Sequence, residues 1–104
     1  MLFENVNAEA LANIYFDGKV ASHSLVTKEG DKITIGIIYP GSYHFNTESA
    51  ERMEITSGSC KVKIDGSNDE SSYESGHYFE VPESSGFNIT VEDQICQYVC
   101  RFLD

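Results

Sequence analysis

The 104-residue chain is poor in positive charge, has no tryptophan and only two prolines, and contains no long apolar run. Seven Lys and Arg residues stand against seventeen Asp and Glu, which gives a formal net charge of -10. Such a charge repels nucleic acids and anionic membrane surfaces. No segment approaches the roughly 20 apolar residues of a membrane-spanning helix, and the N-terminus does not resemble a secretory signal. We therefore expect a cytoplasmic protein with no nucleic-acid or membrane partner.

Cysteine is also scarce. The chain has Cys60, Cys96 and Cys100, an odd number without the spacing of a disulfide framework. Two of them lie in the apolar segment QICQYVCRFL, where cysteine is usually a small buried hydrophobic residue. We expect reduced thiols and a fold that does not depend on disulfides.

A sustained helical pattern is missing as well. The segment NAEALAN, residues 7–13, could form one or two helical turns. The rest consists of short β-prone segments separated by turn signals every 8 to 12 residues or so, which is typical of an all-β sandwich or barrel. The acidic stretch 65–72 is expected to be a flexible loop, and strands are expected at 19–27, 32–39, 42–45, 51–56, 60–64, 77–81, 87–92 and 94–103.

So many short strands in one small domain favour a single-domain antiparallel barrel or jelly roll, which hides its sheet edges. Within the segment KITIGIIY, alternation places Ile33, Ile35 and Ile37 on one face. The mouths of such barrels are common ligand sites, so inward-facing residues of the middle strands are the candidates for function.

Two stretches resemble the motifs of cupins, small jelly-roll barrels that normally hold a divalent metal with three histidines and a glutamate. The first, GSYHFNTESAERMEITSG (residues 41–58), offers His44, Asn46 and Glu51, and the second is GHYFEVPESSGF (residues 76–87). Asn46 and Phe87 stand where the resemblance implies histidines. Because a transition metal needs about three firm protein ligands, we predict a pocket without a metal. His23 and His77 lie outside this set and are expected at the surface.

The resemblance extends further. Together with IYFDGKVAS (residues 14–22) and CQYVCRFL (residues 96–103), these motifs resemble the pyrimidine/purine nucleoside phosphorylase family, small bacterial cupins formerly classed as a domain of unknown function. The resemblance implies a cupin domain over residues 14–104 after an N-terminal extension over 1–13. It also implies a homodimer that converts a broad range of nucleosides and inorganic phosphate to free base and pentose-1-phosphate. Phosphate is then a co-substrate, and no cofactor or metal is required.

Phosphorolysis calls for a cation to hold phosphate, an aromatic wall for the base, and polar groups for the sugar and the departing base. Arg101 is the candidate cation, because it lies inside the apolar last segment. A salt bridge from Arg101 to Glu51 is an equally open alternative. Alternation sets Arg101 on the face opposite to Tyr98 and Cys100, and the sequence leaves open which face lines the pocket.

The wall has several aromatic candidates, of which Phe87 is the strongest because the cupin pattern directs its position inward. His44, Asn46 and Glu51 are expected to project inward and to contact sugar or base. The other aromatic candidates are Tyr43, Phe45, Phe79 and Tyr98. The predicted site therefore has Arg101 and Glu51 as catalytic residues and His44, Asn46, Tyr43, Phe87 and Tyr98 as substrate-binding residues.

Two other functions remain possible at this point. One is a non-catalytic cupin that binds a small ligand. The other is a weakly metal-dependent enzyme that uses His44 and Glu51.

Overall fold

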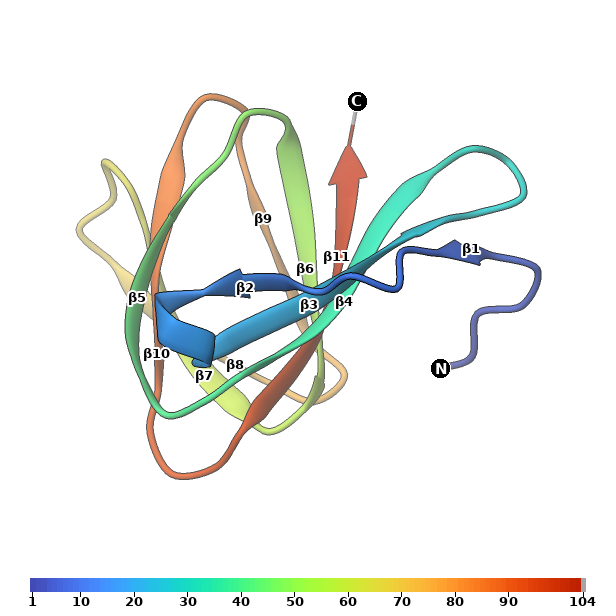
Figure 1. The fold of residues 1–104 in the computed structure, drawn as a ribbon. Coiled ribbons are helices and arrows are strands. Elements are labelled where there is room, and N and C mark those ends of the chain that lie inside the picture. Colours follow the sequence, from blue (N-terminus) through green and yellow to red (C-terminus); the bar gives the residue numbers. More distant parts are fainter. Residues whose placement is uncertain (104) are drawn as a thin grey trace.

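The computed structural model describes residues 1–103 and consists almost entirely of antiparallel strands (Figure 1). The one helical element in these residues is a short 3₁₀ turn, η1 (Phe16–Gly18). No helix in this part of the chain has the length and apolar character needed to cross a bilayer. The strands are β1 (Asn7–Ala8), β2 (Asn13–Tyr15), β3 (Val20–Val26), β4 (Lys32–Ile38), β5 (Gly41–Asn46), β6 (Ala50–Ser57), β7 (Ser59–Ile64), β8 (Glu70–Glu74), β9 (Tyr78–Val81), β10 (Gly86–Val91) and β11 (Cys96–Leu103).

The strands form two sheets. The larger has the order β1-β3-β4-β11-β6-β9, with β2 also paired to β3, and the smaller has the order β5-β10-β7-β8. Figure 1 shows the smaller sheet on the left and the larger sheet beside it. This arrangement confirms the predicted all-β, cupin-type jelly roll.

The main core lies between the two sheets. Strand β10 illustrates its origin, since Phe87, Ile89 and Val91 are buried while Asn88 is exposed. Alternation on a pleated strand therefore sends every second residue into the core. The fully buried members of the core are Val20, Ile38, Ile55, Ile89, Val81, Val91 and Cys96.

A second, smaller apolar cluster lies on the outer face of the larger sheet. Ile33 packs there with Leu25 and Val99, and Phe3 and Val6 cover them. Ile33, Ile35 and Ile37 thus share one face as predicted. That face looks away from the barrel interior, since Ile35 is 37% exposed whereas Ile38, on the opposite face, is buried.

The predicted helical turns over residues 7–13 are wrong. This segment instead contributes β1 and the start of β2, which pair with β3 through Asn7↔Val26 and Asn13↔Ser22. The backbone of β3 would otherwise present unpaired hydrogen-bonding groups along its edge, and the segment satisfies them. Strand β2 spans the predicted boundary between residues 13 and 14.

The predicted loop over residues 65–72 is too long. From Glu70 onward the chain forms β8, which pairs with β7 at the edge of the smaller sheet. Its residues are polar because an edge strand is largely solvated, so β8 lacks the apolar alternation of an inner strand. All other strands from β3 to β11 end within two residues of the predicted limits.

Candidate active site

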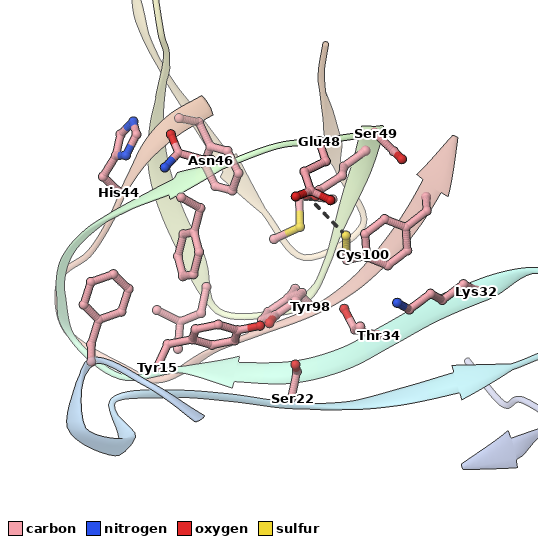
Figure 2. A pocket seen from close by; sticks show the side chains of 17 residues that line it. Tyr15, Ser22, Lys32, Thr34, His44, Asn46, Glu48, Ser49, Tyr98 and Cys100 are labelled. Carbon is pink, nitrogen blue, oxygen red and sulfur yellow. Dashed lines mark hydrogen bonds between the residues drawn. The ribbon is translucent and has the colours of Figure 1, made fainter. Parts of the chain in front are cut away.

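A cavity of about 800 Å³ lies between the two sheets. It falls within the size range of small-molecule sites. Its lining divides into an aromatic end and a polar end, with Tyr98 between them (Figure 2). The aromatic end comprises Tyr15, Phe16, Phe45 and Phe87, with His44 and Asn46 at its rim, and the polar end comprises Lys32, Thr34, Glu48, Ser49, Glu51 and Cys100, with Phe102 beside Lys32.

The aromatic end is built on two neighbouring strands. Phe45 on β5 and Phe87 on β10 are register partners, and their rings stack with centroids 5.7 Å apart at 27°. Tyr15 and Phe16 approach Phe45 edge-on, at 5.9 and 5.5 Å. Each of these two is 45% exposed, so the aromatic end offers accessible ring surface to a flat ligand.

Phe16 reaches this position through a strained turn. Phe16 and Asp17 have positive φ angles of 52° and 56°, a conformation that costs free energy for residues other than glycine. The amide of Lys19 donates to the Phe16 carbonyl at 3.1 Å and closes the turn. The Phe16 ring lies 5.0 Å from that of Tyr43, and this packing offsets part of the strain. The turn thus fixes an aromatic side chain over the cavity.

Tyr98 forms part of the cavity wall between the two ends. Its ring passes over Gly36 of β4, where an added Cβ would come within 2.8 Å of the Tyr98 hydroxyl. Burial raises the pKa of Tyr98 to about 12, and a hydrogen bond with Ser22 opposes this rise. Tyr98 is therefore a neutral phenol that can donate or accept a hydrogen bond inside the cavity.

Glu51 and Cys100 form a hydrogen-bonded pair deep in the polar end. The Cys100 thiol donates to Glu51 Oε1 at 3.5 Å. Burial raises the pKa of Glu51, and the bond from Cys100 opposes this rise. Burial and the neighbouring Glu51 raise the pKa of Cys100, which remains a thiol. A carboxyl group with a raised pKa is suited to donate a proton during a reaction.

The structure brings together only part of the predicted site. Glu51, Phe87 and Tyr98 line the cavity, and His44 and Asn46 line its rim. Arg101 and Tyr43 differ from the prediction.

Arg101 lies on the outer face of the larger sheet, so its predicted place in the pocket is wrong. Its Nε donates to Glu54 Oε2 at 2.8 Å, and its guanidinium lies 5.5 Å from the ring centre of Phe3. The alternative of a salt bridge to Glu51 is wrong as well, because the partner is Glu54. Strand alternation explains both errors: Tyr98 and Cys100 face the cavity, and Arg101 between Cys100 and Phe102 faces outward.

His44 and Tyr43 occupy different places. His44 lines the rim of the cavity rather than its interior: it belongs to the exposed face of β5, its Nε2 lies 2.9 Å from Asp65 Oδ2, and Figure 2 shows its ring at the outer rim. Tyr43 is buried in the core, donates its hydroxyl to the carbonyls of Tyr39 and Pro40, and does not line the cavity. Phe45, between them, provides the inward-facing side chain.

Several lining residues were not predicted. Lys32 and Thr34 face inward because the apolar residues of β4 that alternate with them cover the outer face. Tyr15 and Phe16 enter from a turn near the N-terminus, and Ser49 precedes β6. Only the alternation of Lys32 and Thr34 against Ile33 and Ile35 could have indicated this face from the sequence.

The donor set does not fit a cupin metal. Within residues 1–103, no three His, Cys, Asp or Glu side chains are grouped so that they could hold an ion. His44 pairs with Asp65 at the rim, while Glu51 pairs with Cys100 inside. Phe87 fills a position where the cupin pattern has a ligand, so a metal would find too few firm donors here.

Comparison with known proteins identifies the family. The family model for pyrimidine/purine nucleoside phosphorylase matches residues 10–102. The chain belongs to this family. A pyrimidine/purine nucleoside phosphorylase of Methylobacillus flagellatus is 46% identical over 100 residues and covers 96% of both chains. Another from Herminiimonas arsenicoxydans is 46% identical over 101 residues, covering 97% of this chain and 96% of that one.

Solved structures agree with the fold of this nucleoside phosphorylase family member. A protein of unknown function from Acinetobacter sp. ADP1 superposes with a TM-score of 0.94 at 38% identity and covers 98% of both chains. A protein of unknown function from Vibrio parahaemolyticus gives a TM-score of 0.83 at 35% identity, covering 89% of this chain and 97% of that one.

Proposed function

We propose that this protein is a nucleoside phosphorylase of broad specificity that converts a nucleoside and inorganic phosphate to a free base and a pentose-1-phosphate without a metal. The observation that carries this proposal is the cavity, which joins an aromatic end to a polar end containing a buried acid, in a chain of this family. The names of the relatives support the same activity.

The reaction makes one bond and breaks another. A phosphate oxygen attacks C1′ of the pentose and forms the C–O bond, while the electron pair of the C1′–N bond leaves with the base. Glu51, in its protonated form, delivers a proton to the departing base, and phosphate is the co-substrate. Tyr98 and Asn46 provide hydrogen bonds to the sugar or the edge of the base.

Broad specificity follows from the way the base is held. A stacking surface made of Tyr15, Phe16 and Phe45 accepts purines and pyrimidines, because every base has an aromatic face. The buried Phe87 ring packs against Phe45 and supports this surface. A nucleoside whose base is stacked on this wall has its C1′ held in place for the reaction. Such positioning lowers the entropic part of the activation barrier for phosphorolysis.

The purified protein, incubated with uridine, adenosine and xanthosine, tests this proposal. Release of free base from each nucleoside should require phosphate and should be insensitive to EDTA. Loss of activity with EDTA would support the metal-dependent alternative with His44 and Glu51. Nucleoside binding without release of base under any condition would support a ligand-binding cupin instead.

We also propose that the protein is a cytoplasmic homodimer that acts in nucleotide salvage. A shallow groove on the outer face of the larger sheet supports the dimer, since it is lined by apolar side chains including Ile35, Ile37 and Val99. A second copy that covers these strands would bury apolar surface now exposed to water.

A further inference from the structure

We propose that Lys32 binds the attacking phosphate, which places the phosphate subsite at the polar end of the cavity beside Thr34 and Ser49. This inference rests on the proposed phosphorolysis and assigns the cation that it needs. It replaces Arg101, which the fold directs to the opposite face of β11.

The distribution of positive charge supports Lys32 as the phosphate ligand. All seven Lys and Arg residues lie within residues 1–103, and Lys32 is the one among them that lines the cavity. Three of the others form salt bridges elsewhere: Arg52 with Glu80, Arg101 with Glu54, and Lys61 with Glu92. In a chain with a net charge of -10, phosphate entering the cavity has no other Lys or Arg on its lining to contact.

The orientation of β4 directs Lys32 toward the cavity. Lys32 and Thr34 are two residues apart on one strand and therefore point to the same face, which is the cavity side. Figure 2 shows the Lys32 amine and the Thr34 hydroxyl at the same end of the cavity. Lys32 Nζ lies 5.4 Å from the ring centre of Phe102, which helps to hold the lysine side chain against the wall. An ammonium group and nearby hydroxyl groups are suitable donors for a phosphate dianion.

Lys32 lies at the opposite end of the cavity from the aromatic residues. In a single displacement at a sugar carbon, the nucleophile and the leaving group occupy opposite faces of the ring. Tyr15 and Phe45, whose ring centres lie 5.9 Å apart, define the site for the departing base, and Figure 2 shows Tyr98 between Tyr15 and Lys32. A pentose placed against Tyr98 therefore has its base on the aromatic side and phosphate on the Lys32 side.

The acids of the polar end are compatible with this arrangement. Glu51 repels phosphate only when ionised, and its burial favours the protonated form. Glu48 is exposed, so solvent and salt screen its charge. Because Glu51 lies on the Lys32 side, its proton reaches the departing base through the hydroxyl of Tyr98, which lies between the two ends of the cavity. A bound phosphate favours the proton on Glu51.

Steady-state kinetics with uridine and varied phosphate tests the assignment. Lys32→Gln should raise the phosphate KM by about 10-fold or more, the loss expected for one charge-assisted contact. The KM for uridine should stay within about twofold, since the lysine does not contact the nucleoside. Lys32→Arg should recover most of the phosphate affinity. Lys61→Gln, which alters a surface lysine paired with Glu92, is the matched control and should leave both constants unchanged.

Calorimetric titration of the same variants with inorganic phosphate separates this inference from the proposed function. Weaker phosphate binding by Lys32→Gln, with normal binding by Lys61→Gln, would support the subsite even if the wild-type protein released no base. An unchanged phosphate KM and unchanged phosphate binding in Lys32→Gln would overturn it. Circular dichroism should show a native fold in every variant, because Lys32 is exposed.

Discussion

In the proposed reaction, Glu51 is the residue whose protonation links the cavity most directly to catalysis. Burial raises its pKa, so a larger fraction of the carboxyl groups keeps the proton than in an ordinary glutamate. If this proton goes to the departing base, activity should fall as the pH rises through the raised pKa of Glu51. Glu51→Gln should lower kcat by about 100-fold or more and remove this fall. Measurement of kcat from about pH 4 to about pH 9 checks both effects, because this range covers ordinary and strongly raised carboxyl pKa values.

Glu83→Gln makes the same change at an exposed position away from the cavity lining and serves as the control. It should keep the wild-type rate and pH profile. A Glu51→Gln variant with full activity would contradict the role of Glu51 as proton donor.

The same residue should affect stability with pH. Because its pKa is higher in the folded protein than the ordinary 4.5, the folded state binds more protons than the unfolded chain between these two values. The free energy of unfolding should therefore fall as the pH rises through this interval. Urea denaturation at several pH values should show a smaller fall for Glu51→Gln, and an identical pH dependence in both proteins would contradict the expectation.

At the scale of the strand, Gly36 sets the shape of the cavity wall. A Cβ at this position would lie 2.5 Å from the Ala21 carbonyl oxygen, 2.8 Å from Ser22 Cβ and 2.8 Å from the Tyr98 hydroxyl. The contact with the backbone of β3 cannot be relieved by rotation of a side chain. Gly36→Ala should lower the free energy of unfolding by about 1–3 kcal/mol, as expected for overpacking, and should raise the nucleoside KM because Tyr98 is displaced.

Chemical denaturation and nucleoside kinetics check this prediction. Tyr98→Phe removes one of the three contacts, so a double variant with Gly36→Ala should be less destabilised than the sum of the single variants. A Gly36→Ala protein as stable as the wild type would show that β3 and β4 have more freedom than their spacing indicates.

The strands were predictable from sequence because apolar alternation and turn residues mark them, as in β10 and β4. The face of a strand was harder to predict. In β11, Tyr98 is buried toward the cavity and Val99 is buried in the outer cluster. Because both faces of this strand carry buried residues, alternation alone did not show which face Arg101 occupies. In β5, Phe45 rather than His44 faces inward, which depends on the register with Phe87.

Parts of the site come from segments with weak sequence signals. Phe16 reaches the cavity because Phe16 and Asp17 adopt left-handed backbone conformations. In the sequence FDGK, only Gly18 indicates such a conformation. Lys32 is one of several lysines near a turn. Its alternation with Ile33 separates the two faces of β4, and the pairing of β4 with β11 shows which of these faces lines the cavity. The family resemblance implied the reaction, and the structure shows how the lining residues are arranged.

At the scale of the whole molecule, the outer face of the larger sheet should hold two copies together. Ile35 lies in the groove on this face and is 37% exposed. Ile35→Glu would place a charge against an apolar surface of the second copy, which is costly without a partner. Sedimentation equilibrium should show a dimer for the wild type and a shift to monomer for this variant.

Leu11→Glu is the matched control, because Leu11 is 85% exposed and does not line this groove. It should remain a dimer. A monomeric wild-type protein, or an Ile35→Glu variant that dimerises as tightly as the wild type, would contradict this interface.

In the proposed reaction, phosphate, rather than water or a metal-bound nucleophile, attacks the sugar inside the barrel. Phosphorus-31 NMR of the purified, EDTA-treated protein with uridine and inorganic phosphate measures this directly. The account predicts that a pentose-1-phosphate signal grows as inorganic phosphate is consumed, with one uracil released for each phosphate ester formed. Free pentose without a phosphate ester, or a reaction that starts only when a metal is added back, would contradict it.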